Sequence, residues 1–308
     1  MRYIINFFLL VTTILWGQDS TSVKRHSYKV WVRPSISINY LSIDVEDRPY
    51  NEVLGNKKLL PNYPLTAGLG AGIDNTYISF DYSKNIMPLR NVNTYGKTTF
   101  FDFQLHSFLT KKLLLDFYYQ NYKGFYYEDK GKVYLLTDTQ IQQVGTEVLF
   151  FKNWKQFPIE NVFSEKKTVI EPLLGWYVGG GVYYHKAAIP LESFENTDIF
   201  RHLQAGISGG ITLQLQLSEQ VSFWGLGGLG AYFGRELSSV SRLKVKDYMN
   251  FRVYSLLSYT HKNWALEFSV LYNNKRLYFK NSDLMSINSE TFKLSYIRRL
   301  KVKSKYKL

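Results

Sequence analysis

Apolar and polar residues alternate one by one along much of this chain, and the pattern is clearest over 203–217. The odd positions there are Leu, Ile, Ala or Gly, and the even positions are Gln, Gly, Ser or Thr. A period of two places successive side chains on opposite faces of a β-strand. The segment exceeds the ~5–6 residues of a usual globular strand and fits a membrane-spanning strand of ~9–11 residues with extensions. Ile211 is therefore expected to face lipid, and Thr212 the interior.

The same period identifies strands along the rest of the chain. A proline at position 34 predicts a bulge in the first strand, because proline cannot donate a hydrogen bond to the neighbouring strand. Twelve strands are expected, over approximately 30–40, 65–73, 76–83, 98–109, 113–127, 140–152, 170–185, 203–217, 220–234, 247–261, 264–273 and 289–300.

The breaks between these segments alternate in length. The long breaks are 44–64, 84–97, 128–139, 187–201, 235–246 and 279–288, and the short ones are 74–75, 110–112, 153–169, 218–219 and 262. Only 153–169 departs from the pattern. Short turns at one end and long loops at the other are typical of an up-and-down barrel in an outer membrane.

These observations predict an all-β fold, an up-and-down antiparallel transmembrane β-barrel of about 12 strands. In hydrocarbon every backbone N–H and C=O must be paired within the protein, and among sheets only a closed barrel achieves this. An even strand number places both ends of the chain on one side, which is expected to be the periplasm.

The N-terminus predicts export. Arg2 precedes the apolar run 4–16, and Leu15 and Gly17 suit positions −3 and −1 of a cleavage site before Gln18. This arrangement is typical of a secretory signal and is too short for a spanning helix. We therefore expect a cleaved signal peptide at 1–17 and a barrel domain at 18–308, located in the outer membrane.

Composition agrees with a barrel. The chain has 25 Tyr and 21 Phe, and Tyr suits the boundary between lipid and water. Its mean hydropathy of −0.22 is expected where every second residue faces a polar interior. With no Cys, the fold needs neither a disulfide nor a thiolate metal site.

The formal charge of +13 invites a nucleic-acid hypothesis, which the distribution of the charge argues against. Basic residues are spread over turns, loops and the tail 301–307, with no basic helix or aromatic RNA-binding motif. Outer-membrane lipid and glycolipid headgroups are the expected partners, together with the barrel-assembly machinery during insertion. No nucleic acid and no cofactor are expected.

Charged and amide side chains on the predicted inner face are candidates for a site in the lumen. Such groups either pair across a narrow interior and hold the wall in shape, or line a wet solute path. The candidates are Arg33, Asp102, Gln104, His106, Asp116, Gln120, Glu147, Glu171, Arg252, Glu267 and Lys293.

A catalytic site is not expected. Asp102 and His106 share one face, and an Asp near a His could orient the imidazole. Ser107, the adjacent hydroxyl, points to the opposite face of a regular strand, and no nucleophile elbow is present. The five His are scattered without ligand spacing, and the glycine clusters do not open a helix, so no metal or nucleotide site is predicted.

The segment Asp116-Phe-Tyr-Tyr-Gln-Asn-Tyr-Lys-Gly-Phe-Tyr126 resembles the D-x-x-Y-Q-x-Y-K-G-[FY]-Y segment of a Bacteroidota family of predicted outer-membrane barrels of undefined function. A second element of that family, K-x-F-S, is only partly kept at 155–158. The resemblance implies a barrel and a location, and supplies no catalytic residues. Residues of the motif to test are Asp116, Gln120, Tyr122, Lys123 and Gly124, for which packing of the wall is the preferred role.

Three functions remain open from the sequence. The first is a non-enzymatic barrel, either a narrow small-solute channel or a structural or surface barrel, because a count of twelve lies between filled and open barrels. The second is a binder of a ligand or glycolipid through the outer loops. The third is a lipid-modifying enzyme. The sequence does not identify the solute or ligand, whether the lumen is open or plugged, or the oligomeric state.

Overall fold

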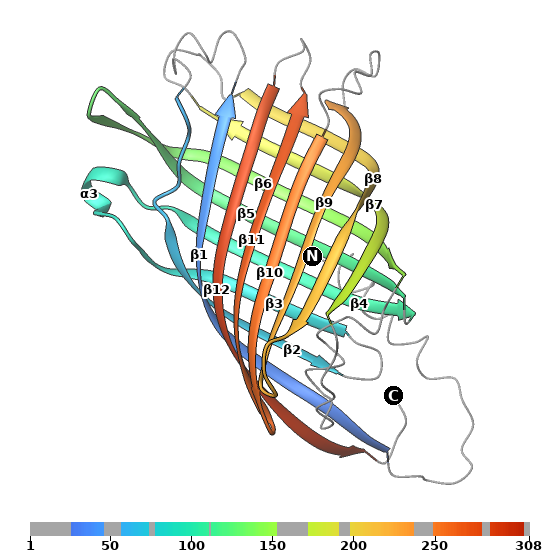
Figure 1. Cartoon of the computed structure of the whole chain (residues 1–308). Helices are drawn as coiled ribbons and strands as arrows, with labels where there is room; N and C mark the ends of the chain where they lie inside the picture. Colours follow the sequence, from blue (N-terminus) through green and yellow to red (C-terminus); the bar gives the residue numbers. More distant parts are fainter. Residues whose placement is uncertain are drawn as a thin grey trace.

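The computed structural model describes residues 26–45, 57–73, 78–110, 112–152, 172–190, 198–236, 249–278 and 284–304. They form one closed antiparallel barrel of twelve strands (Figure 1). The fold class and strand number predicted from the alternation are thus confirmed, including the short, glycine-rich second strand. The expected signal peptide and the candidate Glu171 lie outside the described residues.

The strands are longer than the segments that the sequence marks. They are β1 (His26–Val45), β2 (Pro64–Ile73), β3 (Ile78–Pro88), β4 (Thr99–Thr110), β5 (Leu113–Asp129), β6 (Lys132–Phe151), β7 (Leu173–Ile189), β8 (Asp198–Gln216), β9 (Val221–Glu236), β10 (Met249–His261), β11 (Trp264–Tyr278) and β12 (Leu284–Ser304). In the described part of the chain the one helix is α3 (Val92–Tyr95), and no helix there is long and apolar enough to cross a membrane.

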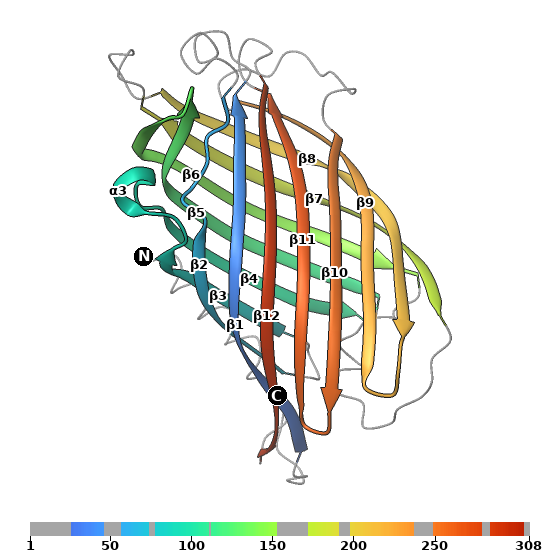
Figure 2. The same ribbon diagram turned by 60° about the vertical axis from the view of Figure 1, so that its left-hand side comes forward.

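Each strand pairs with its neighbours in sequence, and β1 pairs with β12 to close the ring. The closing pair runs from His26 opposite Ser304 to Val45 opposite Met285, and Figure 2 shows β1 and β12 side by side. The first strand therefore begins where the last one ends, as the even count predicts.

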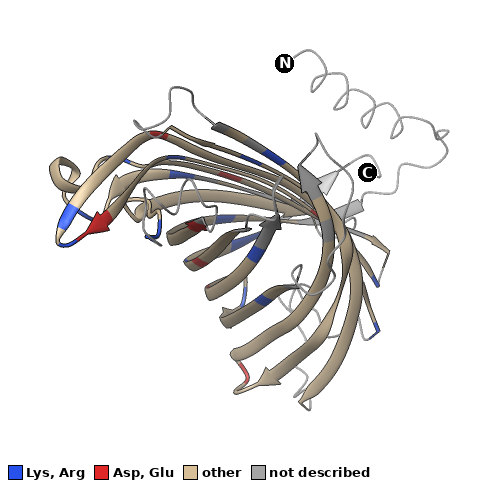
Figure 3. Cartoon of the chain, turned by 90° about the horizontal axis from the view of Figure 1, so that it is seen from above, with Lys and Arg blue, Asp and Glu red and all other residues tan. Residues whose placement is uncertain are grey.

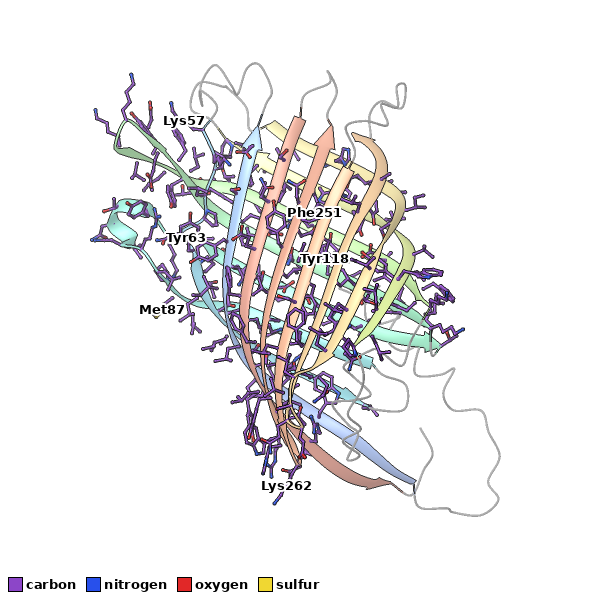
Figure 4. All side chains as sticks on the ribbon, in the orientation of Figure 1. Lys57, Tyr63, Met87, Tyr118, Phe251 and Lys262 are labelled. Carbon is purple, nitrogen blue, oxygen red and sulfur yellow. The ribbon has the colours of Figure 1, made fainter. Side chains whose placement is uncertain are left out.

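The two ends of the barrel differ in their connections. We call the end with the hairpin turns at 217–220 and 262–263 the turn end, and the end with residues 57–63 and 89–98 the loop end. Figure 4 labels Lys262 at the turn end and Lys57 and Tyr63 at the loop end. β1 begins and β12 finishes at the turn end.

The side chains of β8 alternate between the two faces as predicted. Ile211 is 60% exposed on the outside, whereas Thr212 is 4% exposed and Gln204 is fully buried on the inside. The period of two therefore sorts this strand into an outer apolar face and an inner polar face.

The outer face of the wall is apolar around the ring. Its exposed large hydrophobic side chains include Ile36, Leu69, Val148, Leu174, Val178, Leu203, Ile207, Ile211, Leu229, Val253, Leu257, Leu266, Phe268, Leu294 and Leu300, with Tyr82, Trp176, Tyr259 and Tyr296 among them. Viewed from above, the charged segments are scattered and of both signs (Figure 3). An apolar surface of this extent suits contact with lipid.

The prediction of a long loop at 128–139 was wrong. β5 and β6 continue through it as a hairpin that projects from the loop end (Figure 1), with Asp129 opposite Lys132. Lys130 and Gly131 have φ values of 47° and 78°, the positive pair that two-residue hairpin turns require. The strand period is absent here because neither face is buried, and the adjacent Tyr134 and Leu135 are both exposed.

The bulge predicted at Pro34 is also absent. β1 keeps one register with β12 on either side of it, with Val32 opposite Arg298 and Ser35 opposite Ser295. The missing N–H of proline interrupts this ladder without inserting a residue. A register shift does occur in β5, between Lys123 and Phe125.

Candidate functional site in the barrel interior

Apolar side chains fill the interior at both ends of the barrel. The loop-end cluster consists of Leu41, Ile43, Leu59, Phe100, Tyr122, Phe125, Ile141, Ala187, Ile189, Met285 and Ile287. The turn-end cluster consists of Leu114, Leu149, Phe151, Tyr177, Trp224, Leu226 and Leu256. Each cluster joins strands from opposite sides of the ring, such as β6 with β12 in the first and β5 with β10 in the second. Side chains therefore meet across the lumen at both ends.

Between the two clusters lies a polar layer centred on Glu147 of β6. Its Oε2 accepts a hydrogen bond from Arg252 Nη1 of β10 at 2.7 Å. Its Oε1 accepts from Tyr232 at 3.0 Å and from Ser208 at 3.3 Å. The sequence predicts both Glu147 and Arg252 on the inner face, and the structure brings them together across the barrel, 105 residues apart.

Lys275 of β11 lies in the same layer. Its ammonium group donates to the hydroxyl of Tyr118 and lies 4.4 Å and 4.7 Å from the ring centres of Tyr118 and Tyr183. Sequence reasoning missed this lysine because the predicted strand stops at 273. Continuing the period of two from Glu267 would have placed Lys275 on the inner face. Tyr118, which Figure 4 labels within the barrel, was missed because tyrosine is expected at the lipid boundary.

His106 and Asp116, on the neighbouring strands β4 and β5, also form a pair. His106 Nδ1 lies 2.6 Å from Asp116 Oδ1, and the two residues are opposite each other in the register. A carboxylate in this position can orient an imidazole, as in hydrolase triads. Ser107 follows His106 on the strand and so points to the other face, as the period of two predicts.

The remaining inner-face candidates make contacts within the wall or across it. Gln104 donates to Asp102 at 2.8 Å along β4. Arg33 lies 3.9 Å from Glu267 and has its guanidinium 5.1 Å from the Trp31 ring centre. The register pairs the remaining two, Gln120 and Lys293, with Gln143 and Ser37. These contacts fit the wall-holding role that the sequence suggests.

A pair of buried histidines lies on β7 and β8. His185 and His202 are opposite each other in the register, and their ring centres are 6.2 Å apart. Gln204, also buried, is the next inward residue on β8. The sequence shows these two His 17 positions apart with no ligand spacing, so only the strand register could have paired them. Across the described residues, no group of three or more His, Asp or Glu is placed to hold a metal ion.

The resemblance motif 116–126 lies on β5, and its residues have structural contacts. Tyr122 is buried and packs on Phe100, with ring centres 4.4 Å apart. Lys123 pairs with Asp138 at 3.3 Å. Gly124 has φ +90°, and a Cβ there would overlap the carbonyl oxygen of Lys97. The glycine therefore allows the loop of 89–98 to lie directly on β5.

A set of contacts that we call the loop-end hub joins three segments distant in the sequence. Its centre is Asn62, which is fully buried. Asn62 Nδ2 donates to the carbonyl oxygens of Arg90 at 3.1 Å and Gly96 at 2.7 Å, and the backbone N–H of Arg90 donates to Asn62 Oδ1 at 3.0 Å. Thr98 donates to the Gly124 carbonyl at 2.6 Å. Segments 57–63 and 89–98 are thereby fixed to the β5–β6 hairpin.

Arg90 completes the hub through its side chain. Nη1 donates to the Tyr126 hydroxyl at 2.9 Å and to Glu128 Oε1 at 3.1 Å, and the guanidinium lies 4.8 Å from the Tyr95 ring centre and 4.9 Å from that of Tyr63. Burial alone lowers the pKa of Arg90, but the surrounding oxygens outweigh it and raise the pKa overall; they belong to Tyr126, Tyr63, Tyr95 and Glu128. Residue order carries no signal for these contacts of Arg90, because the residues involved come from three separate segments.

Solved structures similar to this chain are bacterial outer-membrane proteins of low sequence identity. The translocator domain of autotransporter NalP from Neisseria meningitidis has 10% identity and a TM-score of 0.48, covering 97% of this chain and 96% of that one. The COG4313 outer membrane channel from Pseudomonas putida F1 has 11% identity and a TM-score of 0.39, covering 92% and 100%. The outer membrane protease OmpT from Escherichia coli has 9% identity and a TM-score of 0.35, covering 92% and 100%.

These neighbours include a translocator, a channel and a protease, and at such identities and TM-scores none assigns a role to this chain. A comparison with curated proteins finds no match. A family model matches residues 18–299, which include every strand of the barrel except the last residues of β12. The chain belongs to the family described as the domain of unknown function DUF4421.

Proposed function

We propose that this protein is a non-enzymatic outer-membrane barrel with a closed interior, and that it serves as a surface scaffold through its loop end. The observation that carries the proposal is the meeting of side chains from opposite walls at three levels. These are the loop-end cluster, the Glu147–Arg252 pair and the turn-end cluster. A solute would have to displace all three to pass.

The membrane location rests on the outer face of the wall. Its exposed aliphatic and aromatic side chains surround the ring, whereas the inner face carries the charges. Charged groups are costly in hydrocarbon, and a barrel that is apolar outside and polar inside is stable in a bilayer. The loop-end hub supports the surface role, because it fixes two loops and a projecting hairpin into one defined shape.

Conductance in planar bilayers tests the closed interior. The refolded wild-type protein is expected to give no ion steps. A matched variant, in which Tyr122, Phe125, Trp224 and Leu226 are all replaced by Ala, removes bulk from both apolar clusters and should leak. Discrete steps from the wild-type protein would contradict the scaffold proposal. A heat-dependent gel shift in both proteins would verify that each has folded as a barrel.

A second candidate is a gated path for small solutes, favoured by the polar layer and the small cavity within it. The same recording separates the two functions. The scaffold predicts silence at all voltages and with any solute, whereas a gated path predicts steps under some of these conditions.

Epitope tags test which end faces outward. A tag at the hairpin turn of Lys130 and Gly131 should be labelled on intact cells, because this turn lies at the tip of the loop end. A tag in the turn at 217–220 should need permeabilised cells. The reverse pattern would overturn the proposed orientation and move the scaffold to the periplasmic side.

A further inference from the structure

One cavity in the central polar layer is lined by two cationic side chains and one carboxylate. The cavity has a volume of about 20 Å³, and the residues that line it include Glu147, Arg252 and Lys275. Glu147 is 5% exposed and binds Arg252 at 2.7 Å. One carboxylate thus compensates one of the two cations.

Lys275 is the second cation, and it is 5% exposed. Its ammonium group contacts the Tyr118 hydroxyl, the rings of Tyr118 and Tyr183, and Gln143 Oε1 at 3.5 Å. Among the described residues, no Asp or Glu forms a salt bridge with it. Burial of a charged ammonium without a counter-charge is strongly unfavourable, so its neutral oxygen and ring partners leave a charge to be balanced.

The cavity beside Lys275 is lined by groups that can donate hydrogen bonds. Besides the two cations these are the amides of Asn250 and Asn273. The hydroxyls of Ser208 and Tyr232 also line the cavity, but they donate to Glu147. One water molecule needs ~10–15 Å³ of such a volume. The space therefore suits a ligand of about one heavy atom and is too small for phosphate, sulfate or a sugar.

We infer that this cavity binds one small monovalent anion of halide size between Lys275 and Arg252. Asp116 acts on Arg252 from outside the cavity lining. The anion adds a negative charge beside Lys275 and completes the contact between opposite walls. This inference goes beyond the scaffold role, and it holds or fails independently of conductance and of the loop end.

Thermal unfolding in different sodium salts tests the site. The purified full chain is refolded in a zwitterionic detergent with sodium bromide or with sodium gluconate, whose anion is too large to enter. At equal ionic strength, the unfolding temperature of the wild-type protein should rise with bromide concentration, whereas Lys275→Met should lose the bromide-specific part of the rise. Lys293→Met, which removes an inward lysine outside this cavity, should keep it. General salt effects are shared by all three proteins, so the difference between them carries the test.

Crystals of the wild-type protein grown in bromide provide a second measurement that does not need a variant to fold. An anomalous peak beside Lys275 Nζ supports the site. Equal unfolding temperatures of the wild-type protein in the two salts, with no anomalous peak in the cavity, would overturn the inference and mean that Lys275 is buried as a neutral amine.

Discussion

Two arginine–glutamate pairs, one at the barrel centre and one at the loop end, have similar geometry and different surroundings. Arg252 and Glu147 are 2.7 Å apart, with side chains 26% and 6% exposed. Arg90 and Glu128 are 3.1 Å apart, with side chains 38% and 46% exposed. Only the first carboxylate is withdrawn from water, so the two pairs should differ greatly in their effect on stability.

The comparison also shows which partner matters at each place. At the centre, Glu147 holds Arg252, Tyr232 and Ser208 together, so the acid is the centre of the network. At the loop end the arginine has that position, since Arg90 contacts Glu128, the Tyr126 hydroxyl and three tyrosine rings, of which Tyr126 is one. In the central pair the glutamate therefore makes most of the contacts, and in the loop-end pair the arginine does.

The largest effect is expected from Glu147→Ala. It leaves Arg252 buried without its counter-charge, which typically costs ~3–5 kcal/mol. Glu128→Ala at the loop end should cost ~0–1 kcal/mol, because exposed pairs contribute little. Urea titrations of both variants in phospholipid vesicles measure the free energy of unfolding. An equal loss of unfolding free energy in the two variants would show that burial does not distinguish the two pairs.

The second largest effect is expected from a lysine placed on the outer face of the barrel, and it tests whether that face contacts lipid. Ile211→Lys should cost ~2–4 kcal/mol if Ile211 faces the middle of the bilayer. Leu135 is also exposed but lies on the projecting hairpin, so Leu135→Lys should change stability by less than ~1 kcal/mol. The same titration in vesicles gives both values. A mild effect of lysine at Ile211 would argue that the wall around β8 faces water.

Two glycines with positive φ test the packing of the loop end. Gly124→Ala should cost ~1–3 kcal/mol through backbone strain, and its Cβ would also displace the backbone at Lys97. Gly131 has φ +78°, and no atom lies near the position that a Cβ would take. Gly131→Ala should therefore cost ~1–2 kcal/mol through backbone strain and should displace no neighbouring atom. Proteolysis at 89–98 should therefore increase in the first variant and stay at the wild-type rate in the second.

The smallest effect is expected from Arg90→Lys. Lysine keeps the charge but loses the planar group that contacts the Tyr63 and Tyr95 rings, an interaction of ~0.5–1 kcal/mol at an exposed site. Limited proteolysis at 89–98 should become modestly faster, with the global unfolding free energy nearly unchanged. Arg299→Lys, at the turn end, is the control and should leave this cleavage rate as in the wild type.

The strands of the barrel wall could be predicted from the sequence because they all follow one pattern, the alternation of inward and outward side chains. Burial on one face imposes a period of two, so β8, β11 and the facing of Glu147 and Arg252 follow from residue order. The pattern stops where neither face is buried, and there the hairpin tip within 128–139 was mistaken for a loop. It also stopped short of Lys275, which continues the inward series of β11 just beyond the predicted end.

The interior and the loop end could be predicted only in part, because their contacts depend on register. The inward direction of His106 and Asp116 follows from the period, but their 2.6 Å contact requires the pairing of β4 with β5. Asn62 and Arg90 lie in segments outside the strands, where the alternation of polar and apolar residues does not apply. Asn62 binds backbone groups of another loop, and the Arg90 side chain binds side chains of two other segments, so neither role follows from the residue type alone.

The closing pair of β1 with β12 also fixes the order in which this protein can fold. Partners such as His26 and Ser304 are separated by nearly the whole chain, so their pairing carries the highest loop-closure entropy among the strand pairs described. Local hairpins such as β5–β6 can form early, while the edge of β1 stays open until the final strand is available to pair with it. A chain truncated before β12 would expose two unpaired edges and aggregate rather than insert.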